Sequence, residues 1–73
     1  MFEKIRSIIV DQMFCEPEEV TLYTTLDELG MDGIDKVELI MLVENSFDVA
    51  ITDDEFDGIN TVDDVIRLVE GKV

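Results

Sequence analysis

Residues 29–47, with the sequence LGMDGIDKVELIMLVENSF, form the longest apolar-periodic segment of this 73-residue chain. Asp32 and Asp35 stand three residues apart at its head, where Asp32 can cap a helix and the carboxylate of Asp35 favours the positive N-terminal end. Apolar residues then recur at helical spacing as far as Phe47. We therefore predict a helix from about Gly33 to Phe47.

This predicted helix has apolar residues on two sides. At about 100° per residue, one set of apolar residues, the inner set, lies where other helices can cover it. A second set, the outer set, lies on the opposite side of the helix among carboxylates. Apolar groups ringed by carboxylates are typical of a docking surface, because the charges attract a basic partner and apolar burial holds it. The alternative is that Val37 and Met41 line the core or an internal pocket. The inner set is Leu39, Ile40, Val43 and Phe47; the outer set is Ile34, Val37 and Met41, with Asp35, Glu38, Glu44, Asn45 and Asp48 around it.

The residue pattern before the central helix indicates one helix followed by a long connection. Apolar side chains at helical spacing predict a first amphipathic helix that ends near Phe14. Pro17 suits the first position of a single helical turn. Residues 21–31 lack a sustained period and are expected to form an ordered connection that leucines anchor and Gly30 closes. The expected inner face of the first helix is Phe2, Ile5, Ile9, Gln12 and Met13.

The segment after the central helix predicts two further helices. Thr52 and Glu55 have the spacing of a capping box, which predicts a short helix over residues 53–57 ending at Gly58. Thr61 with Asp64 opens the last helix, since the apolar repeat that follows has helical rather than alternating spacing. That repeat is Val62, Val65, Ile66 and Val69, and Gly71 ends the helix.

The composition excludes several classes of function. The length fits one domain, residues 1–73. Nineteen acidic residues against five basic ones give a net charge of −14, which repels nucleic acid and anionic lipid and favours basic protein partners, although acidity also serves solubility. The chain has no histidine, so catalysis is not expected. Without a membrane-spanning run or a signal-peptide pattern, we expect a soluble, cytoplasmic monomer.

Two features resemble functional sites without meeting their requirements. Cys15 is the only cysteine, which excludes an internal disulfide, and we expect it to act as a small buried hydrophobe. Asp53, Glu55 and Asp57, with Asp64 later, imitate the spacing of a calcium loop. Glu55 is too long for its place in such a loop, and Asp64 stands where a bidentate glutamate is needed. We assign no metal site, and weak binding of divalent cations stays open.

The segment Leu29–Ile40 resembles the signature of the acyl carrier protein family, in which Leu-Gly, Asp-Ser-Leu and Asp-x-Val-Glu-Leu occur at the same offsets. The resemblance implies an all-α fold, a four-helix bundle of three main helices and one short helix, with a hydrophobic interior able to hold an acyl chain. It covers nearly the whole chain, continuing through Met41, Glu44, Phe47, Asp48 and Ile51 and then residues 61–65.

In that family, the serine of Asp-Ser-Leu carries 4'-phosphopantetheine, whose thiol holds the acyl chain as a thioester. Here the position is Gly33, which has no oxygen to modify, so the group cannot be attached to this sequence. Ser7 and Ser46 lie outside the motif and are not expected to substitute. Glycine also suits a tight turn into a helix. The chain is either a natural carrier-like protein that has lost its attachment site or a form altered at residue 33 to stay unmodified.

The resemblance still implies a partner-binding surface on the second helix. It implies a carrier that presents acyl intermediates to enzymes of fatty acid or polyketide synthesis, with phosphopantetheinyl transferase, acyl transferases and condensing enzymes as partners. The alternative is a carrier-derived regulatory or structural module that binds a partner without a prosthetic group. The residues that the resemblance assigns to the partner surface are Asp32, Ile34, Asp35, Val37, Glu38, Met41 and Glu44.

Overall fold

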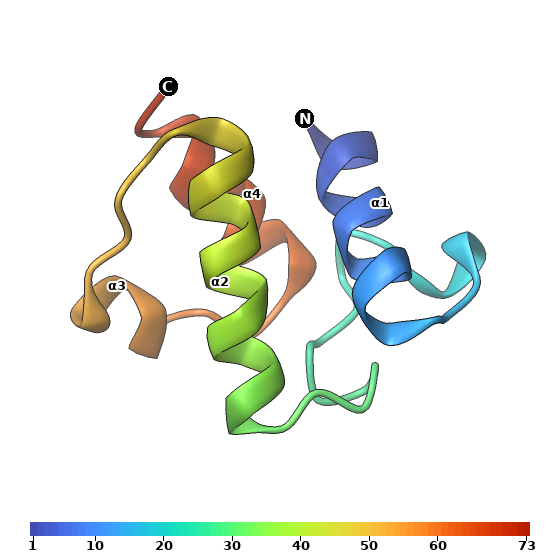
Figure 1. Ribbon diagram of the computed structural model, residues 1–73. Helices are drawn as coiled ribbons and strands as arrows, with labels where there is room; N and C mark the ends of the chain where they lie inside the picture. Colours follow the sequence, from blue (N-terminus) through green and yellow to red (C-terminus); the bar gives the residue numbers. More distant parts are fainter.

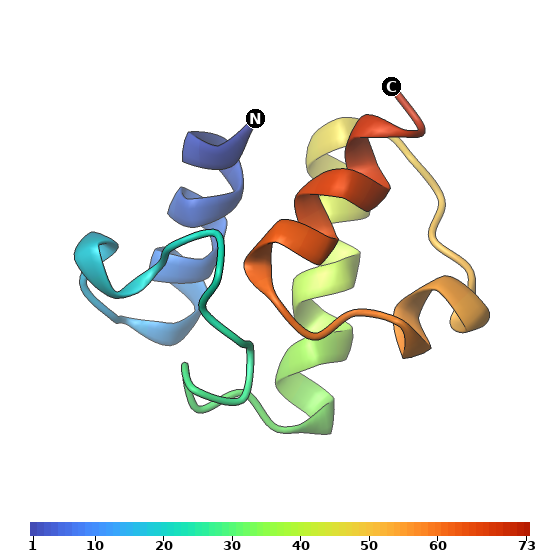
Figure 2. The same cartoon turned by 180° about the vertical axis from the view of Figure 1, so that it is seen from behind.

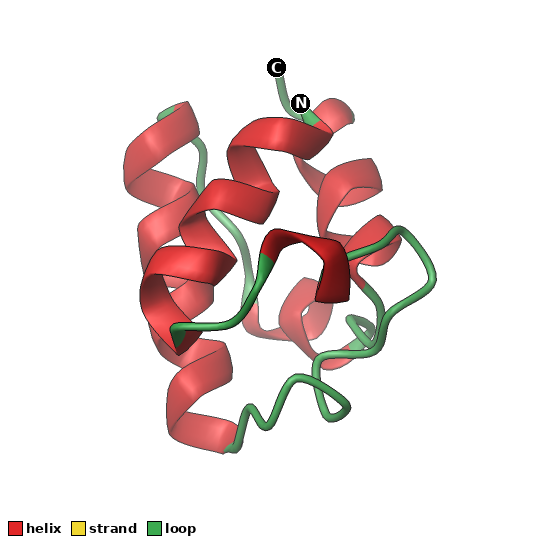
Figure 3. Cartoon of the chain, turned by 90° about the vertical axis from the view of Figure 1, so that its right-hand side faces the viewer, coloured by secondary structure: helices red, strands yellow, loops and turns green.

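The computed structural model describes residues 1–73, which form helices joined by loops, with no β-sheet (Figures 1 and 3). Helices α1 and α2 lie side by side and run in opposite directions, and α4 packs behind α2 (Figures 1 and 2). Both termini lie at one end of the bundle (Figure 1). The predicted all-α fold is therefore confirmed. The elements are α1 (Phe2–Met13), a 3₁₀ turn η1 (Pro17–Glu19), α2 (Gly33–Phe47), α3 (Asp53–Asp57) and α4 (Val62–Glu70).

The central helix α2 has the predicted bounds because its two ends are capped locally. The Asp32 carboxylate accepts the backbone N–H of Asp35 at 2.8 Å, and the Asp35 carboxylate accepts the N–H of Asp32 at 3.2 Å. Together they satisfy two of the N–H groups that a helix start leaves without partners. At the other end Asp48 takes the left-handed conformation and donates its N–H to the Glu44 carbonyl.

Helices α3 and α4 begin in the same manner, as predicted. The hydroxyl of Thr52 accepts the N–H of Glu55, the hydroxyl of Thr61 accepts the N–H of Asp64, and each acidic side chain reaches back to the preceding threonine. The backbone N–H of Thr52, followed by the ammonium of Lys72, holds the pKa of Glu55 below its usual value. The N–H groups of Thr61 and Asn60 lower the pKa of Asp64 in the same way.

The core is apolar throughout and contains no buried polar or charged residue. The predicted inner face of α4 is buried in full, and on α1 the residues Ile5 and Ile9 are buried completely while Phe2 and Met13 are partly covered. Cys15 is half-buried rather than buried, because it lies just beyond α1 at the edge of the core. The buried residues are Ile5, Ile9, Val20, Leu26, Met31, Leu39, Ile40, Val43, Ile59, Val62, Val65, Ile66 and Val69.

The long connection between η1 and α2 is held against the start of α4. The N–H of Leu26 donates to the Asn60 carbonyl at 2.9 Å, and the N–H of Val62 donates to the Thr24 carbonyl at 3.0 Å. Leu26 is buried, whereas Leu22 is exposed, so only some of the leucines anchor the segment as expected. Gly30 closes the connection with a φ of 85°, a conformation that glycine adopts without steric cost.

No helix of this chain combines the length and the apolar composition that a bilayer-spanning segment needs.

Candidate functional site

The outer side of α2 exposes large apolar side chains to solvent. Ile34 is 72% exposed, Val37 49% and Met41 56%. Leu39 and Val43, on the inner side of the same helix, are fully buried. The alternative interpretation, in which Val37 and Met41 line the core, is therefore wrong. The bundle covers only the inner side of α2, so the outer side stays in contact with solvent.

The carboxylates near these apolar residues divide into two kinds. Glu38 is exposed and forms no ion pair, so its charge faces solvent. Asp32 and Asp35 cap the helix, as described above. Glu44 is half-buried and accepts the backbone N–H of Ile51 at 2.8 Å, so it also holds the loop after α2. None of the four takes part in an ion pair, so the negative charge on this side is not neutralised within the chain.

Gly33 is the first residue of α2, and the structure gives no conformational reason for a glycine there. A Cβ added at this position meets no heavy atom within 4 Å, and among the glycines only Gly30 has a positive φ. The interpretation that glycine eases a tight turn into the helix is therefore not supported. The Cβ of an alanine or a serine therefore fits here without displacing any neighbour.

No side-chain hydroxyl is present at the start of α2, because residue 33 is glycine. Ser7 lies on α1, and Ser46 lies near the opposite end of α2, about 20 Å along the helix axis from residue 33. Neither serine lies among the N–H groups at the start of α2, where a phosphodiester is best stabilised.

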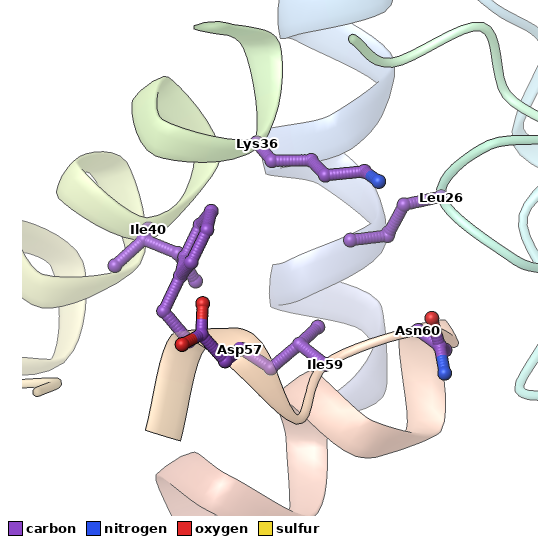
Figure 4. A pocket seen from close by; sticks show the side chains of 7 residues that line it. Leu26, Lys36, Ile40, Asp57, Ile59 and Asn60 are labelled. Atoms are coloured by element: carbon purple, nitrogen blue, oxygen red, sulfur yellow. The ribbon is translucent and has the colours of Figure 1, made fainter. Parts of the chain in front are cut away.

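A cavity of about 190 Å³ lies beside α2, next to the segment that joins α3 to α4. Figure 4 shows Leu26, Ile40 and Ile59 directed toward this space, with Lys36 extending along its edge. The Lys36 ammonium pairs with the Asp27 carboxylate at 2.7 Å. Gly33, Lys36 and Ile40 follow one another at spacings of three and four residues, so they share one side of α2. The full lining is Leu26, Lys36, Ile40, Phe56, Asp57, Ile59 and Asn60.

Sequence reasoning did not assign this cavity to particular residues. Its walls come from the connection, from α2 and from the segment at residues 56–60, which only tertiary packing brings together. The helical periodicity of α2 predicted that Ile40 faces inward, but no local signal places Phe56 or Asn60 beside it.

Comparison with known proteins identifies the family. A family model described as phosphopantetheine attachment site matches residues 3–69. Acyl carrier proteins of Streptococcus pyogenes serotypes M3 and M1 are each 44% identical over 72 residues, covering 99% of this chain and 95% of theirs. This chain belongs to the acyl carrier protein family. The crystal structure of an acyl carrier protein from Thermotoga maritima is 36% identical, covers 96% of this chain and 82% of that chain, and superposes with a TM-score of 0.84.

Membership of the acyl carrier protein family confirms the resemblance found in the sequence and the predicted helical bundle. The relatives are named as carriers, which agrees with a non-catalytic protein. Residues 53–57, which imitate part of the spacing of a calcium loop, fold as the capped helix α3. No three histidine, cysteine or acidic side chains lie together as a group that could hold a metal ion. The outer side of α2 offers exposed apolar side chains beside carboxylates that no ion pair neutralises.

Proposed function

We propose that this member of the acyl carrier protein family docks onto enzymes of fatty acid or polyketide synthesis through the outer side of α2, and that it cannot carry an acyl group. The observation that carries this proposal is the exposure of Ile34, Val37 and Met41 beside carboxylates that no cation neutralises. A small domain gains no stability from such residues, so their use lies in contact with another molecule.

The partners in this proposal are proteins with basic surfaces. A net charge of −14 accelerates encounter with a cationic surface and discourages contact with phosphate backbones. After the encounter, burial of the three apolar side chains holds the complex, and a methionine adapts to differently shaped partners. We propose phosphopantetheinyl transferases, acyl transferases and condensing enzymes as partners, and as contact residues Asp32, Ile34, Asp35, Val37, Glu38, Met41 and Glu44.

The second candidate function is regulation, and Gly33 favours it. A chain that occupies the carrier site of an enzyme without accepting a prosthetic group reduces access of loaded carriers by competition. The space around Gly33 supports this candidate, since packing does not exclude serine and the loss of the hydroxyl therefore changes chemistry rather than shape.

Intact-mass measurement after incubation with a phosphopantetheinyl transferase and coenzyme A tests the proposal. We expect no mass increase for this chain and the addition of one phosphopantetheine group for Gly33→Ser, because the docking side is present and only the nucleophile is missing. Gly33→Ala, which also adds a Cβ but no hydroxyl, is the matched control and should stay unmodified.

The outcome separates the two candidate functions. Modification of Gly33→Ser shows that the docking side still serves the carrier reaction. If Gly33→Ser stays unmodified although its circular dichroism spectrum is unchanged, the surface has diverged and the regulatory function is favoured. A mass increase in the unchanged chain contradicts the proposal, because it places the attachment on Ser7 or Ser46.

A further inference from the structure

Phe14 combines two features that do not stabilise the fold. Its side chain is 94% exposed, the largest exposed fraction among the large hydrophobic residues. Its backbone lies in the left-handed region, with φ 56° and ψ 34°, where it ends α1 by donating its N–H to the Val10 carbonyl at 2.8 Å. A bulky side chain is disfavoured in this conformation, and exposure of a phenyl ring gains nothing from the hydrophobic effect.

The other left-handed residues of the chain show what the fold alone requires. Gly30 has a φ of 85°, and Asp48, which ends α2, has a φ of 55°. Glycine and aspartate tolerate this region, because one lacks a Cβ and the other has a short polar side chain. An apolar residue that ends a helix in this way commonly packs back on the last turn, but the exposure of Phe14 shows that it does not.

Phe14 lies at the same end of the bundle as the start of α2. The side-chain amide of Gln12 donates to the Asp35 carbonyl at 2.7 Å, so the last turn of α1 lies against the first turn of α2. Figure 1 shows the antiparallel pair that produces this arrangement. Ile34, the most exposed apolar residue of α2, directly precedes Asp35. Phe14, the residue after α1, therefore lies toward the end of the bundle where α2 and the proposed docking side begin.

The usual size of a protein interface supports a contact that includes both Phe14 and the outer side of α2. A standard interface buries about 800 Å² on each partner, which is about one sixth of the 4550 Å² that this chain exposes. The whole molecule measures only 27 × 23 × 19 Å. On so small a molecule, a contact of that size centred on α2 is wide enough to include residues of neighbouring elements.

The charges around Phe14 define the kind of partner. The carboxylates nearest to it in the chain are exposed and form no ion pair. A second copy of this chain presents the same negative charge and is repelled, as is an anionic membrane surface. The matching surface is an apolar pocket bordered by lysine or arginine. These nearby carboxylates are Asp11, Glu16, Glu18 and Glu19.

We propose that Phe14 is a second anchor of the docking surface and inserts into such a pocket on the enzyme that binds the outer side of α2. The inference rests on the proposed function and extends the surface beyond the residues assigned there. It explains why the chain keeps a phenyl ring at a position where glycine or asparagine is better for the fold.

Calorimetric titration of the chain with a phosphopantetheinyl transferase tests this inference. Phe14→Gly and Phe14→Asn both tolerate the left-handed conformation, so we expect an unchanged or higher Tm together with an affinity at least tenfold lower, as for a buried aromatic anchor. Tyr23→Ala is the matched control. Tyr23 is also strongly exposed, but it lines a hollow with Phe2, Arg6, Pro17 and Glu18 that includes no residue of α2, so its loss should change the affinity less than twofold.

The remaining outcomes keep the inference distinct from the proposed function. If Met41→Glu weakens binding while the Phe14 variants bind normally, the anchor is refuted and docking through α2 stands. If none of these variants changes the affinity, both proposals fail. A lower Tm for Phe14→Gly assigns the residue a structural role and also refutes the anchor. The same holds if sedimentation shows that Phe14 mediates self-association.

Discussion

The two sides of α2 carry similar residues but have different neighbours. Leu39 and Val43 face the other helices and are fully buried, whereas Ile34 and Met41 face solvent. Both pairs follow the same helical repeat, so hydrophobicity alone does not distinguish them. The difference shows that the bundle buries only the inner side, and it supports the proposed contact of the outer side with another molecule.

The largest effect is expected from truncating the inner side. Leu39→Ala should lower the free energy of unfolding by about 3 kcal/mol, because the lost transfer energy and the new cavity add together. For a domain of this size, that loss corresponds to a Tm lower by more than about 10 °C. Met41→Ala, on the outer side, should cost less than about 0.5 kcal/mol. Urea denaturation measures both, and equal losses would refute this difference between the two sides of α2.

A smaller effect, confined to binding, is expected from adding charge to the outer side. Met41→Glu places a carboxylate where an apolar contact forms, so the affinity for a phosphopantetheinyl transferase should fall at least tenfold while the Tm changes little. Tyr23→Glu adds the same charge away from this side and is the matched control, since it alters only long-range attraction. If both variants change the affinity by the same factor in the same direction, the outer side of α2 has no special role in binding.

The sequence predicted those parts of the fold that depend on local signals. The bounds of α2, α3 and α4 were correct because Asp32, Thr52 and Thr61 each begin a capping box within four residues. The helical repeat also separated the two sides of α2, since a helix converts spacing directly into direction. Family membership was likewise visible, because the motif is contiguous.

Features that depend on tertiary contact were not predicted. The periodicity of α1 placed its end near Phe14 but gave no sign that the ring is exposed or its backbone left-handed. Glu44 was assigned to the partner surface, yet it also holds the N–H of Ile51, which lies seven residues away. The contact between Gln12 and Asp35 joins two helices, and no spacing rule predicts such pairs.

Asp32 caps α2 and also belongs to the proposed docking surface, and its variants can separate these two roles. Asp32→Ala removes the cap of α2 and should lower the free energy of unfolding by about 1 kcal/mol. Asp32→Asn keeps an oxygen that accepts the N–H of Asp35, so it should cost much less. Both variants remove one negative charge beside Ile34 and should slow association with the transferase in low salt. Stopped-flow measurements across salt concentrations test this, because an electrostatic effect fades as salt rises.

The smallest effect concerns acidity, and it separates carboxylates that serve the fold from those that face a partner. The backbone N–H of Thr25, followed by its hydroxyl, holds the pKa of Glu28 below the usual value of 4.5. The N–H groups at the starts of α3 and α4 lower the pKa values of Glu55 and Asp64 as described above. Glu38, on the outer side of α2, has no such hydrogen bond within the chain.

A carboxylate whose pKa is lower in the folded chain binds its proton less readily there than in the unfolded chain, so protonation favours unfolding. The stabilisation is complete above the unfolded pKa, near 4.5 for Glu28, and is lost as the pH falls through the lower folded pKa. We therefore expect the Tm to fall below about pH 4.5 at constant moderate salt. Glu28→Gln should make that acid-side fall smaller, because the variant has no proton to take up at this position, whereas Glu38→Gln should leave it unchanged. An equal effect of both variants on melting curves between pH 3 and 7 would show that general repulsion, rather than the capping hydrogen bonds, governs the acid response.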